Sequence, residues 1–245
     1  ENFGLLKTTQ LASLTTDQVL SLTTAQIDVL TTAQLSKAFS TAMIASLTTD
    51  QLTVLTSADI AALSVSQLAA IAADDLATLE TLQLKGLSST QVAAFTTDQI
   101  TALTSEQLTN LTTVQLKSWS ATQVKSLTSS NIASLTTDQL TNLTSTQLAG
   151  LSTRQVQALT SSQIADALTT SQLTGAFSTA MIRALTTTQF FYITTKQLAA
   201  LSATQIAAME TLDVSSLNSN QINGLTTAQM AALTTAQVAA LSATQ

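Results

Sequence analysis

The sequence contains no cysteine, no histidine and no proline, and it has only five glycines. Without cysteine there are no disulfides, thiolate metal ligands or thiol nucleophiles. Without histidine, the commonest metal ligand and the usual neutral-pH base are missing, and haem held by either residue is excluded. No run of about 18 apolar residues occurs, so the sequence predicts no membrane-spanning helix.

Charge is also scarce: 9% of the 245 residues are charged, and the net charge is −6. The eight basic residues are scattered along the chain. Affinity for nucleic acid rests on clustered Lys and Arg, so we expect no nucleic-acid partner. Thr, Ser, Gln and Asn must provide the solubility. Low charge without cysteine is typical of an exported bacterial protein.

What the sequence does contain is one octapeptide, which we call the octad, repeated from Leu6 to the end of the chain. With the first apolar residue at position 1, positions 1 and 6 are apolar throughout, and positions 2 and 3 are mostly Thr or Ser. Such short-period self-similarity indicates a solenoid. Position 5 is Gln in 24 of 30 octads; the exceptions are Met43, Asp59, Asp75, Asn131, Met181 and Asp213.

Neither one continuous helix nor a one-faced strand accounts for this pattern. Eight residues advance a helix by two turns plus about 80°, so positions 1 and 6 would wander around its surface. In a strand, the two positions would point to opposite faces. A β-solenoid with a turn in each octad remains an alternative, although five glycines are few for so many turns.

A short helix in each octad explains every position. Thr or Ser at position 2 serves as the N-cap, and Gln at position 5 reaches back to the N-cap amide, which is a capping box. Apolar positions 1 and 6 then form the hydrophobic staple. The sequence therefore predicts an all-α solenoid, or superhelix, of very short helices, one per octapeptide.

The regular pattern is interrupted by three nine-residue octads and by a longer repeat. Residues 38–44 and 176–182 are near-duplicates, with Phe in place of Leu and Met in place of Gln. We therefore interpret residues 1–245 as a single array with a higher-order repeat of about 138 residues, spanning 39–176 and part of a second copy, 177–245. Because no polar caps are visible at its ends, we expect the array to be part of a longer repeat or a polymer.

These interruptions and the array ends supply the candidate assembly contacts. Their departure from the consensus predicts contacts between coils or subunits; the alternative explanation is local repacking of a corner after gene duplication. The candidates are Leu6, Phe39, Met43, Phe177, Met181, Phe191 and Leu241.

No other residues point to chemistry. The many Thr and Ser residues have no histidine partner for nucleophilic catalysis, so we expect no enzyme, no cofactor and no metal site. Among the aromatic residues, Trp119, Phe190 and Tyr192 are predicted to lie in the core. Phe191, at variable position 7, is the best candidate for an exposed contact.

Two resemblances follow from the octad. Residues 151–156, Leu-Ser-Thr-Arg-Gln-Val, resemble the start of the first helix in TAL-effector repeats. The likeness covers only the cap, so DNA binding is not implied. The chain as a whole is more similar to Thr/Gln-rich octapeptide tracts of large exported bacterial surface proteins. That resemblance implies an extracellular or cell-surface location and a structural or adhesive role, and it supplies no site residues.

We therefore expect a non-enzymatic structural repeat protein of an extracellular filament, stalk or surface layer, with other copies of itself as partners. The alternative is a binding or adhesion module for polysaccharide or ice, because rows of hydroxyl side chains recur at positions 3, 4 and 7. Surface polysaccharide is then the second expected partner.

Overall fold

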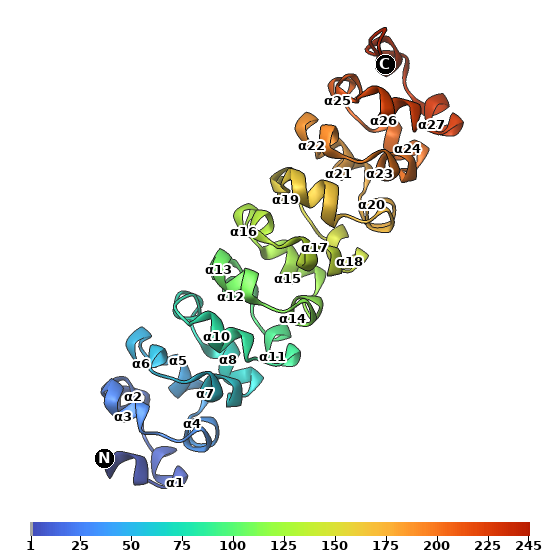
Figure 1. Ribbon diagram of the computed structural model, residues 1–245. Coiled ribbons are helices and arrows are strands. Elements are labelled where there is room, and N and C mark those ends of the chain that lie inside the picture. Colours follow the sequence, from blue (N-terminus) through green and yellow to red (C-terminus); the bar gives the residue numbers. More distant parts are fainter. Residues whose placement is uncertain (1) are drawn as a thin grey trace. The chain divides into compact units, whose positions relative to one another are not determined.

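A computed structural model describes residues 2–245 as a succession of short helices joined by tight turns (Figure 1). This described part of the chain contains 28 α-helices and no strand. Each α-helix has four to seven residues. The predicted all-α class is confirmed, and the β-solenoid alternative is wrong for these residues.

The chain forms two compact units, which meet between Ser126 and Leu127. This boundary falls between two octads, those that begin at Trp119 and Leu127. It does not coincide with the start of the second long repeat at Phe177. The single-array interpretation of residues 1–245 stays a prediction.

The first unit comprises a short 3-10 helix and fifteen α-helices within the described residues. They are η1 (Asn2–Leu5), α1 (Thr8–Leu11), α2 (Thr16–Leu20), α3 (Thr24–Asp28), α4 (Thr32–Ala38), α5 (Thr41–Ala45), α6 (Thr49–Thr53), α7 (Ser57–Ala62), α8 (Val65–Ala70), α9 (Ala73–Leu76), α10 (Thr81–Lys85), α11 (Ser89–Ala93), α12 (Thr97–Ala102), α13 (Ser105–Asn110), α14 (Thr113–Lys117) and α15 (Ala121–Ser126).

The second unit comprises thirteen α-helices and one π-helix. They are α16 (Ser129–Ser134), α17 (Thr137–Asn142), α18 (Ser145–Ala149), α19 (Thr153–Ala158), the π-helix η2 (Gln163–Ala167), α20 (Thr170–Ala176), α21 (Thr179–Ala184), α22 (Thr187–Tyr192), α23 (Thr195–Ala200), α24 (Ala203–Ala207), α25 (Thr211–Ser216), α26 (Ser219–Asn223), α27 (Thr227–Ala232) and α28 (Thr235–Ala239).

The predicted capping box starts most of these helices. At α12, the N-cap Thr96 has extended backbone angles, φ −69° and ψ 160°. Its hydroxyl accepts from the Gln99 amide, and the Gln99 side chain accepts from the Thr96 amide. Helices α9 and α25, whose N-cap residues are Ala72 and Glu210, lack a side-chain cap bond. Each octad therefore defines its own helix start from residues only three apart.

Stacking of every third helix builds the solenoid within each unit. In the first unit, α12 packs against α9 and α15; in the second, α19 packs against α16 and α21, with η2 between them in the chain. Three octads thus make one turn. A core of apolar side chains lies inside. Along most of the chain position 6 is fully buried and position 1 nearly so, as at Ile100 (0% exposed) and Leu103 (3%), whereas the last position-6 residues, Met230 (38%) and Val238 (49%), are exposed. The staple residues therefore form the core.

The three nine-residue octads place their extra residue at the helix C-terminus. Helices α4 and α20 are lengthened to seven residues, and the third becomes the π-helix η2. In all three, the added residue is a buried alanine: Ala38, Ala167 or Ala176. A small side chain is accommodated there because the turn must still close onto the same core.

Among residues 2–245, no helix is long and apolar enough to cross a membrane.

Candidate functional site

The most frequent polar group in the interior is the position-5 glutamine, and it does more than complete a capping box. The Gln99 side chain is 1% exposed, and its Oε1 accepts from the Thr96 amide at 2.9 Å. Its Nε2 donates to the carbonyls of Leu68, at 2.9 Å, and Ile71, at 2.7 Å. These carbonyls lie at the end of α8, where the helix leaves acceptors without intrahelical partners. One side chain therefore joins the start of one helix to the end of another.

The same cross-turn bond recurs in both units. In each case, the glutamine Nε2 lies 2.6 to 2.9 Å from the carbonyl at position 1 of the third octad before it. The first unit holds nine such glutamines: Gln34, Gln51, Gln67, Gln83, Gln91, Gln99, Gln107, Gln115 and Gln123. In the second unit, the glutamines with this bond include Gln155, Gln163, Gln172, Gln189, Gln197, Gln205, Gln221, Gln229, Gln237 and Gln245.

Aspartate at position 5 bonds across the turn in a different way. A carboxylate cannot donate to carbonyls, and each of these three aspartates instead accepts from a threonine hydroxyl at position 3, three octads earlier. The pairs are Thr32–Asp59, Thr49–Asp75 and Thr187–Asp213. A polar link between turns is therefore kept, with donor and acceptor exchanged.

Asp213 is the most deeply buried of these carboxylates, at 4% exposed. Burial raises the pKa of its carboxyl above the ordinary value, because desolvation disfavours the charged form. The nearby Glu210 charge acts in the same direction. Hydrogen bonds from the Thr187 hydroxyl and the Glu210 backbone oppose the shift.

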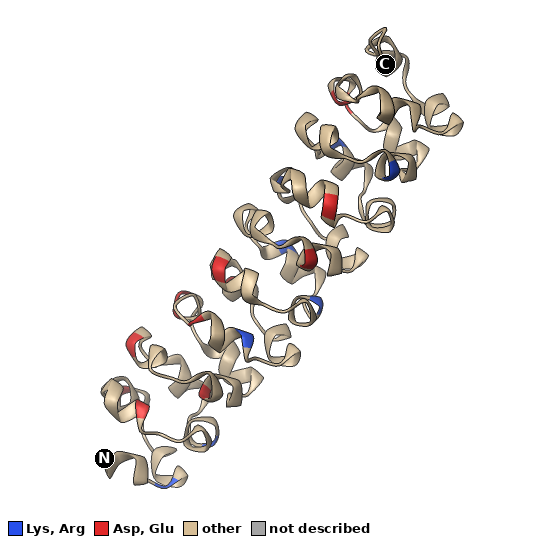
Figure 2. Cartoon of the chain, in the orientation of Figure 1, with Lys and Arg blue, Asp and Glu red and all other residues tan. Residues whose placement is uncertain are grey.

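The outer surface carries hydroxyl side chains and few charges. Thr97 and Thr137 at position 3 and Ser130 at position 4 are exposed. Figure 2 shows acidic and basic residues spread over many helices, without a cluster of Lys and Arg. Within residues 2–245, no group of three or more acidic side chains could hold a metal ion. This surface is suited to neutral polar contacts.

Three pockets lie between successive turns, all at the same register. All three share positions 1 to 3 of one octad and positions 2 and 5 of the third octad after it, and residues at positions 4 and 7 complete each lining. The largest, about 510 Å³, is lined by Glu210 and Leu212, and the second, about 410 Å³, by the equivalent Glu80 and Leu82. The third, about 270 Å³, includes Lys196. The inter-turn groove is therefore a property of the repeat, and its lining varies from octad to octad.

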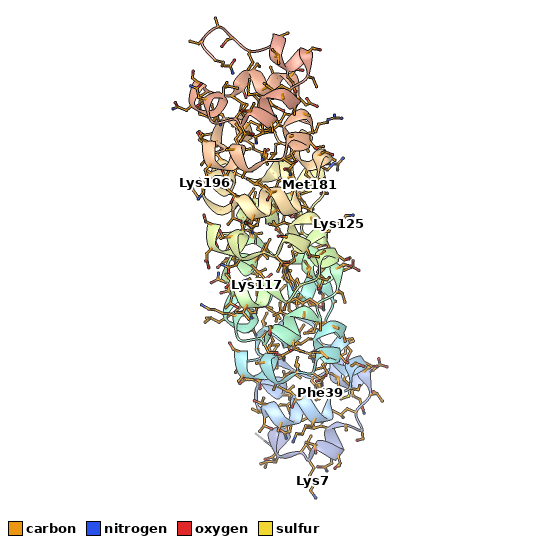
Figure 3. All side chains as sticks on the ribbon, turned by 90° about the vertical axis from the view of Figure 1, so that its right-hand side faces the viewer. Lys7, Phe39, Lys117, Lys125, Met181 and Lys196 are labelled. Carbon is orange, nitrogen blue, oxygen red and sulfur yellow. The ribbon has the colours of Figure 1, made fainter. Side chains whose placement is uncertain are left out.

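The structure places the predicted assembly contacts in two groups. Phe39, Met43, Phe177 and Met181 are at most 4% exposed, so packing within their own units accounts for their apolar character. In Figure 3, Phe39 lies among the helices, whereas Lys196 lies at the edge of the ribbon. Leu6 and Leu241 are half-buried, and Phe191 is exposed. Their roles in assembly stay predictions.

Among the aromatic residues, the core prediction is confirmed for two and wrong for one. Phe190 is fully buried, and Trp119 is 3% exposed, with its Nε1 donating to the Val92 carbonyl at 2.9 Å. Tyr192 is 45% exposed, contrary to the prediction. It follows the core residue Phe190 by two positions and so lies at position 8, outside the staple. It instead contacts Phe191, with the ring centroids 5.4 Å apart and the planes at 81°.

The fold and the repeating glutamine contacts define a helical repeat protein. Residues 68–105, 102–137 and 206–243 match the family model for the ALTTAQ repeat. The six letters of that name stand in this chain at residues 232–237. These three segments are therefore similar to a recognised repeat family, which fits the helical repeat architecture of the chain. No curated protein matches the chain.

Proposed function

We propose that this chain is a non-enzymatic structural repeat protein of an extracellular filament, stalk or surface layer. The observation that supports it most is the cross-turn glutamine bond, which recurs at most octads of each unit. Each stacked turn is stabilised by its neighbours, as in other solenoids. Such a repeating network suits a protein whose task is to hold a shape.

Imaging and light scattering of the purified chain test the assembly part of this proposal. We expect ordered multi-copy particles to form as the protein concentration rises. Isolated single copies at every concentration would contradict assembly. Proteolysis of intact cells of the source organism tests the location, because a surface protein is degraded while cytoplasmic markers survive.

A second candidate function is binding of polysaccharide or ice. The exposed hydroxyl groups at positions 3 and 4 favour it, because they recur at each turn and are not all used in capping. A thermal-hysteresis assay separates the two ligands, since only ice binding lowers the freezing point below the melting point. Absence of both hysteresis and saccharide binding would remove this candidate.

A further inference from the structure

Two aromatic side chains in the described residues, Phe191 and Tyr192, are exposed, and a third, Phe3, is half-buried. The chain has six Phe, one Trp and one Tyr. Phe39, Phe95, Trp119, Phe177 and Phe190 are buried, whereas Phe191 is 57% and Tyr192 45% exposed. Core packing therefore does not account for either of the last two residues.

Phe191 and Tyr192 meet edge to face at the end of α22. This is a favoured geometry for an aromatic pair. It keeps two adjacent rings at the surface, where octads elsewhere carry mainly Ala, Ser or Thr at positions 7 and 8. Adjacent exposed apolar groups indicate a contact site more strongly than scattered ones.

The surroundings of this pair are polar and concave. Helix α22 packs against η2 of the previous turn, and η2 carries the exposed Asp166. Single-turn π-helices are rare and frequent at functional sites. The third pocket is lined by Ala165 of η2, by Thr169, Thr170 and Thr194, and by Lys196, the last two just beyond Tyr192 in the chain. The hydroxyls of Thr169 and Thr194 are engaged in capping boxes. The pocket therefore offers the Thr170 hydroxyl and the Lys196 ammonium group, and Lys196 follows Tyr192 by four residues in the chain.

We propose that Phe191 and Tyr192, together with this pocket, bind a neutral saccharide chain. The apolar C–H face of a sugar ring packs on an exposed aromatic ring, and its hydroxyls bond to Thr, Lys and Asp side chains. Nucleic acid also stacks on aromatic rings but requires a basic groove, whereas this chain has a net charge of −6. The inference rests on the second candidate function and assigns its ligand class and site.

The single tyrosine provides a direct test. Protein labelled with 3-fluorotyrosine gives one fluorine signal, from Tyr192, and 5-fluorotryptophan labelling gives one from Trp119, which is buried in the other unit. Each sample is titrated with neutral hexasaccharides of β-1,4-glucose, β-1,4-xylose and α-1,4-glucose, and with an oligogalacturonate as the acidic comparison. We expect at least one neutral sugar to shift the Tyr192 signal saturably, while the Trp119 signal stays in place.

Variants identify the contact residues. Phe191→Ala should weaken binding at least about tenfold, and Lys196→Gln should weaken it about threefold, a smaller effect typical of a rim contact. Val114→Ala is the matched control, because Val114 is an equally exposed apolar residue in the other unit (65%). Circular dichroism checks that helix content is unchanged in each variant.

Three outcomes would overturn the assignment: no neutral saccharide shifts the Tyr192 signal, Phe191→Ala binds as tightly as the wild type, or the oligogalacturonate binds more tightly than every neutral sugar. A Tyr192 signal that depends on protein concentration without sugar would also overturn it, by showing a contact between copies. The three saccharide results do not bear on the structural function, which imaging and light scattering test separately; a contact between copies would instead favour assembly.

Discussion

The hydroxyl of Thr187 donates a hydrogen bond to the Asp213 carboxylate at 2.9 Å, joining two turns of the solenoid across 26 residues. Elsewhere in the unit, neighbouring turns are linked by a position-5 glutamine that donates to a backbone carbonyl. Asp213 therefore replaces the usual glutamine of this contact and adds a titratable group to the interior.

This buried carboxyl predicts a pH-dependent stability. Its pKa is raised on folding, so the folded state binds the proton more tightly than the unfolded state, whose pKa is about 4. The contribution of Asp213 is then most favourable below about pH 4 and is lost as the pH rises through the folded-state pKa. Asp213→Asn should stabilise the protein relative to wild type at pH 7, and this advantage should shrink towards pH 4. Urea unfolding at several pH values measures the difference.

Asp98→Asn is the control for this experiment, because Asp98 is exposed in the first unit. It should change stability by less than about 0.5 kcal/mol at each pH. An Asp213→Asn effect that is the same from pH 4 to 7 would contradict the predicted titration.

Loss of a cross-turn glutamine should cost more than loss of a capping box alone. Gln99→Ala removes the acceptor for the Thr96 amide and the donor to two buried carbonyls. We expect the free energy of unfolding to fall by about 2–4 kcal/mol, since unsatisfied buried groups cost about 1–3 kcal/mol each. Gln18→Ala removes only a box bond on an exposed helix and should cost about 1 kcal/mol. Equal losses in the two variants would show that the cross-turn bond contributes nothing.

Adjacent threonines should respond differently to truncation. Thr96 accepts the Gln99 amide, whereas the exposed Thr97 hydroxyl makes no side-chain cap. Thr96→Ala should destabilise by about 0.5–2 kcal/mol, and Thr97→Ala should stay within about 0.5 kcal/mol of wild type. Thr96→Ala and Gln99→Ala disrupt the same capping box. Their losses of stability should therefore not add up in the double variant. Similar losses at Thr96 and Thr97 would mean that the helix start is misplaced.

Phe190 and Phe191 form a second matched pair. Phe190 is fully buried in the second unit, and Phe191 is 57% exposed. Phe190→Ala should reduce stability by about 3–5 kcal/mol through the cavity that it leaves, while Phe191→Ala should change it by less than about 0.5 kcal/mol. Thermal unfolding followed by circular dichroism distinguishes them. A large loss for Phe191→Ala would indicate a structural role and weaken its use as a binding-site probe.

The helix starts could be predicted from the sequence because the capping box involves residues only three apart. Thr96 and Gln99 carry that information within one octad. The bond from Gln99 to Ile71 could not be predicted, because it depends on the number of octads per turn. Since all octads share one pattern, the sequence does not specify which of them become neighbours.

The aromatic surface was predictable only in part. Position 7 lies outside the staple, which predicts an outward Phe191, and its exposure confirms this. The core prediction for Tyr192 is wrong because position 8 also lies outside the staple. The adjoining pocket forms from residues in two successive turns, and no local pattern joins those segments.

The spacing of the cross-turn glutamine bond has a consequence for how such a chain changes length. Each glutamine Nε2 bonds to the position-1 carbonyl of the third octad before it, and every octad has a carbonyl at position 1. Deleting or duplicating a whole octad therefore moves later glutamines onto equivalent partners within the unit. Unequal recombination between near-identical coding segments can therefore lengthen or shorten the array by whole octads, and a glutamine that lies at least three octads into the unit keeps an equivalent partner.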